Sequence, residues 1–203
     1  IRPLLLQAGE LTPIEKAERR VLVLANPGHG LENMQASAAM YLGMQLLLPG
    51  EWAPSHRHTP NAVRMVVEGE GAWTTVGGEK CPMSRGDLIL TPTGLWHEHG
   101  HDGSEPVVWM DGLDIPILAF FDAQFSENYP EEAQPVTTRE GTSLARYGSN
   151  LAPLEPVAPF GKTSPVFSYP YGRSREALAA LARNGDPDAC HGWKMQYVNP
   201  LSG

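Results

Sequence analysis

Two histidines stand one residue apart in the stretch "PGEWAPSHRHTPNAVRMVVEGEG", which runs from Pro49 to Gly71. Side chains two apart on a β-strand share a face and lie about 6.6 Å apart along it. His56 and His58 can therefore lean onto one ion at the ~2.1 Å of a metal–nitrogen bond. A single His-x-His motif is weak support for a metal site, because seven histidines in 203 residues produce one such motif by chance in roughly one chain in four.

A third histidine follows in "GDLILTPTGLWHEHGH", with the spacing Gly86-x5-Pro92-x-Gly94-x2-His97. This composition produces that spacing by chance in under about one per cent of chains. Gly86 permits a turn before a strand, and the Pro92-Thr93-Gly94 turn leads back to a neighbouring strand. We expect His97 to be the third ligand of a site begun by His56 and His58.

The elements that must position these histidines are short strands. From Met40 to Trp109 the chain alternates short apolar runs with PG, GEG, GG, RG and PTG turns. Closely spaced short strands of this kind are typical of an antiparallel sandwich or barrel. The runs are "YLGMQLLL", "VRMVVE", "AWTTV", "DLILT" and "VVWMDGLDI".

The flanking segments differ from this pattern. Thr12, Pro13 and Ile14 predict the start of a short helix that continues to about Arg20. Residues 129–171 are rich in proline and predict a strap or linker, whereas "SREALAALARNG", residues 174–185, predicts a helix. We expect three segments: an N-terminal arm and helix over 1–37, a barrel with the metal site over 38–126, and a strap, linker and helix over 127–203.

Composition excludes several partners. The net charge is -8 and the 15 Lys and Arg are scattered, so no basic surface for nucleic acid is expected. No apolar run approaches the ~18 residues that span a membrane, and the first residues do not resemble a signal peptide. Cys81 and Cys190 form no Cys-x-x-Cys motif, which favours a reducing compartment, the cytoplasm.

The spacings Gly50-x5-His56-x-His58 and Gly86 to His97 resemble the two signature motifs of the cupins, small jelly-roll barrels that usually hold a metal. The resemblance implies an all-β cupin fold. The common first motif continues with a glutamate ligand three or four residues beyond the second histidine, where this chain has Ala62 or Val63. Glu68 lies too far along the chain to replace it. We therefore expect three neutral histidines, which leave the charge of a dication for an anionic ligand to neutralise.

That altered motif, with "AERRVLVLANPG", "HRHTPNAVRMVVEGEGAWT" and "PVVWMDGLDIPILAFFDAQF", resembles the gentisate 1,2-dioxygenase family. Relatives in that family cleave salicylate and 1-hydroxy-2-naphthoate. The likeness runs through the whole chain, but family members normally carry a second cupin barrel C-terminal to the first, which this sequence does not include. The resemblance implies a homo-oligomer, expected to be a tetramer.

The resemblance also implies the chemistry. Fe(II) bound facially by three histidines keeps adjacent positions open for substrate and dioxygen. A hydroxylated benzoate would bind through its carboxylate and neighbouring ring hydroxyl, and both atoms of O2 would open the ring between those two carbons. Gentisate would give maleylpyruvate. Salicylate and 1-hydroxy-2-naphthoate remain alternative substrates.

Three residues are candidates for substrate binding. Arg64 stands on an otherwise apolar strand, so its charge either reaches out to water or faces the interior and meets a carboxylate; the family's substrate-binding arginine occupies this position. Gln45 needs a partner among apolar neighbours, either substrate or backbone. Tyr41 shares the face of Gln45, and either lines the pocket or packs in the core.

Two residues are candidates for catalysis. His99 has the same strand parity as His97, and either exchanges a proton with a substrate hydroxyl or serves as a hydrogen-bonding or exposed histidine. Asp111 is expected to orient His99 or to contact the distal hydroxyl of gentisate. His101 is expected in a turn, and Arg19 and Arg20 are expected on the N-terminal helix in contact with solvent, or else covering the active site as part of an arm.

Two functions from other classes compete with the dioxygenase. The first is a cupin that binds an aromatic acid without converting it. The second is an isomerase or lyase with Zn or Mn, which the missing glutamate and the "WMDGLDIP" stretch disfavour. Metal analysis and oxygen uptake separate the three.

Overall fold

The structure is a computed structural model that describes residues 1–17, 20–151, 153–154 and 163–202. Its strands are β1 (Arg20–Val23), β2 (Tyr41–Leu47), β3 (Trp52–His58), β4 (Ala62–Glu68), β5 (Glu70–Val76), β6 (Glu79–Ser84), β7 (Leu88–Thr91), β8 (His97–His101), β9 (Val107–Leu113), β10 (Ser126–Asn128) and β11 (Ser168–Tyr169). Its α-helices are α1 (Arg2–Leu11), α2 (Ile14–Ala17), α3 (Ile115–Phe120), α4 (Thr142–Tyr147) and α5 (Tyr171–Asn184), and two 3-10 turns span Pro27–His29 and Leu31–Asn33.

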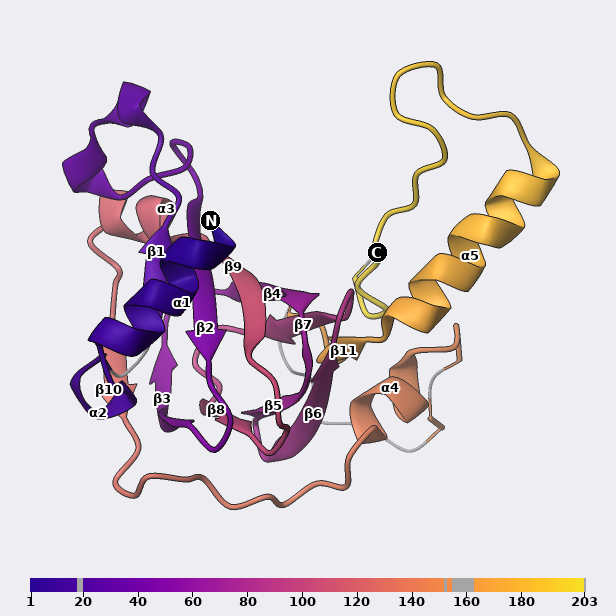
Figure 1. Cartoon of the computed structure of the whole chain (residues 1–203). Helices are drawn as coiled ribbons and strands as arrows, with labels where there is room; N and C mark the ends of the chain where they lie inside the picture. The colour runs from indigo at the N-terminus through magenta and orange to yellow at the C-terminus, as the bar shows by residue number, and fades with distance from the viewer. Residues whose placement is uncertain (18–19, 152, 155–162, 203) are drawn as a thin grey trace.

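The strands form two antiparallel sheets that enclose the core (Figure 1). One sheet has the order β1-β2-β9-β4-β7-β11 and the other the order β10-β3-β8-β5-β6. Neighbours in each sheet are often distant in sequence, as a jelly roll requires. The all-β barrel predicted from the short apolar runs is confirmed.

Strand alternation separates the inside of the barrel from its outer face. On β9, Val107, Trp109 and Asp111 share one face, and the first two belong to a core cluster of buried residues between the sheets. Val108 lies on the other face, in a second cluster. The first cluster consists of Leu47, Val66, Ala72, Val76, Cys81, Met83, Ile89, Val107, Trp109 and Phe167.

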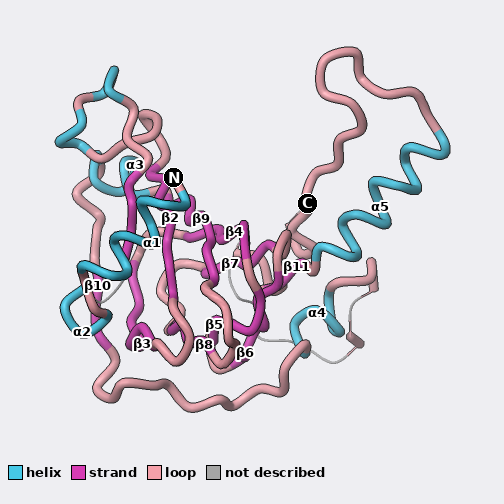
Figure 2. Tube along the Cα trace, in the orientation of Figure 1, coloured by secondary structure: helices cyan, strands magenta, loops and turns pink. Residues whose placement is uncertain are grey.

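Helix α1 covers the outer face of β1 and β2 (Figure 2). Leu5 is 1% exposed and packs with Met44, Leu46 and Val108 in the second cluster. The sequence prediction of one helix from Thr12 to about Arg20 is wrong in extent. The main N-terminal helix ends at Leu11, α2 has only four residues, and Arg20 begins β1, because its β-branched and apolar neighbours pair with β2.

The segment after the barrel includes an ordered strap over residues 129–138. Buried Glu98 accepts a hydrogen bond from the backbone N–H of Gln134 at 2.8 Å. Farther along, buried Glu79 accepts from the N–H and hydroxyl of Ser143, both at 3.0 Å, and so anchors α4. The residues between 155 and 162, which belong to the predicted linker, lie outside the described residues.

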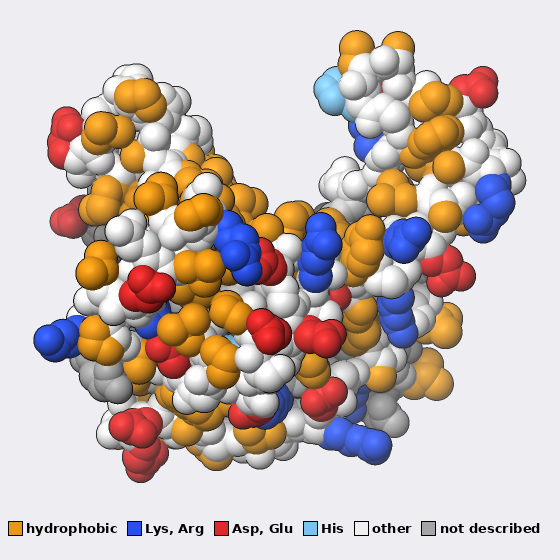
Figure 3. Space-filling model, in the orientation of Figure 1, with side chains coloured by type: hydrophobic (Ala, Val, Ile, Leu, Met, Phe, Trp, Pro, Cys, Tyr) orange, Lys and Arg blue, Asp and Glu red, His pale blue; other side chains and the backbone are white. Residues whose placement is uncertain are grey.

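The predicted C-terminal helix is confirmed as α5, three residues longer at its start than expected. It projects from the barrel together with the loop that follows, so that the outline is hollowed between this arm and the N-terminal elements (Figure 3). Among the described residues, no helix is both long and apolar enough to cross a membrane.

Candidate metal centre and adjoining cavity

Three histidines converge from two neighbouring strands. His56 on β3 is the direct antiparallel partner of His97 on β8, and His58 follows on the same strand. A register irregularity between Ala53 and His56 reflects a local departure from regular pairing just before the pair. Ligand nitrogens of His56, His58 and His97 all lie within 4.8 Å of one another. The pairing of β3 with β8 therefore brings together the three histidines that the sequence spacing predicted as ligands.

Backbone carbonyls fix which nitrogen each ring presents. Nδ1 of His56 lies 2.9 Å from the carbonyl of Pro54, Nδ1 of His58 lies 2.8 Å from that of Pro60, and Nδ1 of His97 lies 3.0 Å from that of Leu95. A carbonyl oxygen can only accept, so each Nδ1 carries the hydrogen and donates it. In each ring the lone pair is then on Nε2, which is the atom available to a metal.

The electrostatics of the site favour a neutral ring at His97. His97 is fully buried, and burial, followed by repulsion from His56 and His58, holds its pKa well below its ordinary value of 6.5. Its Nε2 has no hydrogen-bond partner among the described residues. A buried lone pair without a partner is unfavourable unless something binds it, and neutral imidazoles are good ligands for Fe, Zn, Cu and Ni. The residues present therefore fit a transition-metal ion.

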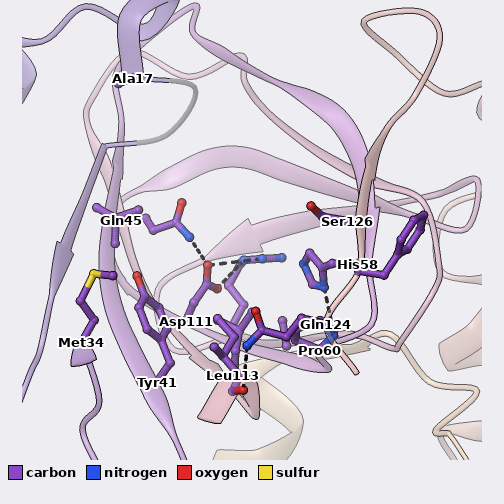
Figure 4. A pocket seen from close by; sticks show the side chains of 15 residues that line it. Ala17, Met34, Tyr41, Gln45, His58, Pro60, Asp111, Leu113, Gln124 and Ser126 are labelled. Carbon is purple, nitrogen blue, oxygen red and sulfur yellow. Dashed lines mark hydrogen bonds and ion pairs between the residues drawn. The ribbon is translucent and has the colours of Figure 1, made fainter. Parts of the chain in front are cut away.

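A cavity of about 650 Å³ adjoins the triad (Figure 4). Five of the residues predicted as site residues line it: Tyr41, Gln45, His58, Arg64 and Asp111. The rest of its wall is formed by Ala17, Val21, Met34, Pro60, Ala62, Leu113, Ile115, Gln124, Phe125 and Ser126. A cavity with an apolar wall and a few polar groups suits a small aromatic acid.

Arg64 faces the interior, which decides between its two expected orientations. Its Nε lies 2.8 Å from Oδ1 of Asp111, and both side chains are 2% exposed. Gln45 donates a short hydrogen bond from Nε2 to Oδ2 of the same carboxylate. The carboxylate of Asp111 thus balances the charge of a guanidinium buried in the core. The partner of Gln45 is thus the side chain of Asp111, and neither the substrate nor the backbone, the two partners expected from the sequence.

His99 lies beside the triad but bonds to a residue other than the one expected. The ring is fully buried, with its centroid 5.9 Å from that of His97 and 5.4 Å from that of Trp109. Its Nδ1 is 2.9 Å from the hydroxyl of Thr74, the residue directly opposite on β5. Asp111, expected to orient His99, instead bonds to Arg64 and Gln45.

The structure corrects two further expectations. His101 is not in a turn: it ends β8, is 2% exposed and donates from Nε2 to the carbonyl of Glu105 at 2.6 Å. Arg20 is not solvated: it is 4% exposed, forms a close ion pair with Glu51 and donates to the carbonyl of Thr12 at 3.2 Å. Arg19 lies outside the described residues.

Sequence reasoning missed several polar residues around the site. No role is predicted from the sequence for Thr74 and Thr91, whose hydroxyl oxygens both lie 3.4 Å from Nη1 of Arg64. Their inward parity on β5 and β7 was the signal that could have found them. Gln124 and Ser126 reach the cavity from the segment after α3, where no periodicity indicates position.

Comparisons with known proteins agree with this geometry. Residues 43–115 match the Cupin domain family. The whole chain is 62% identical to a gentisate 1,2-dioxygenase from Ralstonia sp and covers 56% of it; 98% of the chain is 50% identical to gentisate 1,2 dioxygenase 1 from Aquipseudomonas alcaligenes and covers 57% of it. The structure of salicylate 1,2-dioxygenase from Pseudaminobacter salicylatoxidans superposes over the whole chain with a TM-score of 0.88 at 38% identity, and the chain covers 59% of it.

The chain thus spans somewhat more than half the length of these relatives. All of its described strands and the three converging histidines fall within the matched part.

Proposed function

Because this chain belongs to the gentisate 1,2-dioxygenase family, we propose that it forms the catalytic part of a ring-cleaving dioxygenase. The reaction inserts both atoms of O2 into gentisate and opens the ring between the carbons that bear the carboxylate and the neighbouring hydroxyl, which gives maleylpyruvate. The observation that carries the proposal is the convergence of His56, His58 and His97 beside a cavity that contains the buried Arg64.

Fe(II) is the metal we propose for the three histidines. Three neutral imidazoles leave the dication charge uncompensated, which favours an anionic substrate over a neutral one. When bound, Fe(II) would supply the oxygen-activating chemistry that side chains lack. An isomerase or lyase with Zn or Mn fits the same ligands but is not supported by the relatives.

Arg64 is the residue we propose to bind the substrate carboxylate. It lines the cavity, and its guanidinium is fixed in place by Asp111, Thr74 and Thr91. A guanidinium held in this way can donate hydrogen bonds to a substrate carboxylate without losing side-chain entropy on binding. Gln45 also bonds to Asp111 and therefore lies next to Arg64. We assign Gln45 the second polar contact to the substrate.

Tyr41 and His99 have different proposed roles. The Tyr41 ring lies at the cavity wall, where it can pack against the aromatic ring of the substrate (Figure 4). His99 is buried next to the triad, so we assign it the hydrogen bond or proton transfer at a substrate hydroxyl. Asp111 acts on the substrate through Arg64.

Oxygen uptake tests the proposal. The chain is loaded anaerobically with Fe(II) and mixed with gentisate, salicylate or 1-hydroxy-2-naphthoate in an oxygen electrode. We expect the highest kcat/KM with gentisate, with salicylate as the second candidate substrate, since the similar salicylate enzyme has also been solved as adducts with gentisate. Iron-loaded protein that binds gentisate without oxygen consumption would identify a cupin that only binds aromatic acids.

We also propose three properties of the whole molecule. The division into an arm (1–37), a barrel (38–126) and a C-terminal strap and helix (127–203) is supported by the family match at residues 43–115. A homo-oligomer is supported by exposed aromatic side chains after β9, where Phe120 is 83% and Phe121 69% exposed, and a tetramer is the form we propose from the family resemblance. A cytoplasmic location is supported by the two free cysteines.

A further inference from the structure

The hydroxyl of Thr74 is within hydrogen-bond distance of both His99 and Arg64. Its oxygen is 2.9 Å from Nδ1 of His99 and 3.4 Å from Nη1 of Arg64, and the side chain is fully buried. The same oxygen lies 3.3 Å from Sδ of Met83. One hydroxyl on β5 therefore contacts two of the residues proposed to act on the substrate.

The hydroxyl is not needed to fill space. Valine has nearly the shape of threonine and is at least as favourable in a buried strand. Burying a hydroxyl is unfavourable unless its hydrogen bonds are made. The neighbouring inward residues of the strand, Ala72 and Val76, are apolar members of the core. Its hydrogen bonds, not packing, explain why a polar residue stands at position 74.

The chemistry of the three partners fixes the direction of the bond from Arg64 and leaves two arrangements for the other two contacts. A guanidinium only donates, so Thr74 accepts from Arg64. The single hydroxyl hydrogen can then go to Nδ1 of His99 or to the sulfur of Met83. An imidazole nitrogen is a stronger acceptor than a thioether sulfur, and it is also the closer atom. The opposite arrangement, in which Nδ1–H of His99 donates to Thr74, would leave the hydroxyl hydrogen to the weak acceptor Met83, so donation from Thr74 to Nδ1 of His99 is the favoured arrangement.

We propose that Thr74 is a positioning residue whose hydroxyl holds the His99 ring by Nδ1, so that the N–H of the ring is at Nε2. The triad histidines have the opposite tautomer, because their Nδ1 atoms donate to carbonyls. His99 thus offers a hydrogen-bond donor where the triad offers lone pairs. The consequence for catalysis rests on the proposed function: Nε2–H of His99 donates to an oxygen of the bound hydroxybenzoate.

Nitrogen NMR of the metal-free chain tests the tautomer directly. Two-bond ¹H–¹⁵N correlation spectra of ¹⁵N-histidine-labelled protein distinguish a protonated from a bare Nδ1, and the His99 signals are assigned by their loss in His99→Gln. We expect a bare Nδ1 in the wild type and in Thr74→Ser. In Thr74→Val we expect a mixture of the two tautomers.

Thr91→Val is the matched control. Thr91 is also buried and also accepts from Nη1 of Arg64 at 3.4 Å. Valine removes the same hydroxyl there, at a position that contacts Arg64 and not His99. The tautomer of His99 should be unchanged in this variant. A wild-type spectrum with hydrogen on Nδ1 would overturn the proposal whether or not any variant folds, and so would an unchanged tautomer in folded Thr74→Val.

Kinetics of the Fe(II)-loaded chain with gentisate test the consequence. Loss of the positioning bond should lower kcat of Thr74→Val by about 3- to 10-fold, the equivalent of one hydrogen bond, with a smaller change in KM, and Thr74→Ser should restore kcat. A chain that shows the expected tautomer but no oxygen uptake would contradict the proposed function alone. An unchanged kcat in Thr74→Val would contradict the role assigned to Thr74.

Discussion

The Nε atom of Arg64 lies 2.8 Å from Oδ1 of Asp111, in a part of the barrel where each side chain is only 2% exposed. The two residues face each other in register on the adjacent strands β4 and β9. A buried ion pair of this kind stabilises a fold little by itself, but an unpaired buried charge is strongly unfavourable. Asp111 thus allows an arginine to be kept in an otherwise apolar interior, beside the cavity.

Replacing one member of this pair should be far more harmful than replacing both. We expect Asp111→Ala to lower the free energy of unfolding by about 3–5 kcal/mol, because Arg64 is left without its counter-charge. The double variant Arg64→Met/Asp111→Leu should recover most of that loss. Urea denaturation measures all of them. The exposed pair Arg57–Glu127 is the control: Glu127→Ala should cost less than about 1 kcal/mol, and an equal cost for Asp111→Ala would contradict this account.

Metal binding should depend on His97, the most deeply buried member of the triad. His97→Ala removes one of three converging nitrogens. We therefore expect this variant to retain less than one iron per chain after it is loaded with Fe(II) and dialysed. Metal analysis by mass spectrometry measures the content. His191→Ala is the control, since this histidine is exposed and bonds to Asp188. If His97→Ala kept both its iron and its turnover, the assignment of ligands would be wrong.

Glu79 should make stability depend on pH. Burial raises its pKa above the ordinary value of 4.5, although hydrogen bonds from Ser143 oppose the shift. The folded state therefore holds a proton that the unfolded state releases as the pH rises above 4.5, so the contribution of Glu79 to stability is complete below that pH and is lost as the pH rises through its folded pKa.

Glu79→Gln mimics the protonated group and should remove that loss. We expect the free energy of unfolding of the wild type to fall relative to Glu79→Gln as the pH rises from 4.5 through the raised pKa of Glu79. Urea denaturation at a series of pH values measures the difference. Glu176→Gln, at an exposed position on α5, should run parallel to the wild type. Parallel curves for Glu79→Gln as well would show that Glu79 does not titrate differently in the two states.

Gly100 should tolerate no side chain. A Cβ atom there would overlap the Trp73 indole, whose Nε1 donates to Asp102 at 2.8 Å. We expect Gly100→Ala to lower the free energy of unfolding by about 1–3 kcal/mol through overpacking. Gly172 on α5 has open space around its Cβ position, so Gly172→Ala should be neutral or stabilising by up to about 1 kcal/mol. Thermal unfolding ranks the two variants, and equal melting temperatures would contradict the steric argument.

The sequence determined what depends on local pattern. Period-two alternation and glycine turns predicted the strands of the barrel, because each strand must hide one face and each turn needs a permissive residue. The spacing of His56, His58 and His97 predicted three converging imidazoles for the same reason: parity along a strand sets the face of each side chain. Local pattern did not predict α1, whose helical form depends on packing Leu5 against Met44, Leu46 and Val108, residues of a sheet far away in the sequence.

Only the tertiary structure decided which polar groups meet. Asp111 bonds to Arg64 and not to His99, and Thr74 bonds to His99, because antiparallel register brings together β4 with β9 and β5 with β8. Register between strands is set by the closure of the whole barrel and by the turns that join its strands, and a single strand's sequence does not contain it. The sequence therefore predicted which types of side chain occupy the site, whereas the pairing of the strands determined which of them form hydrogen bonds with one another.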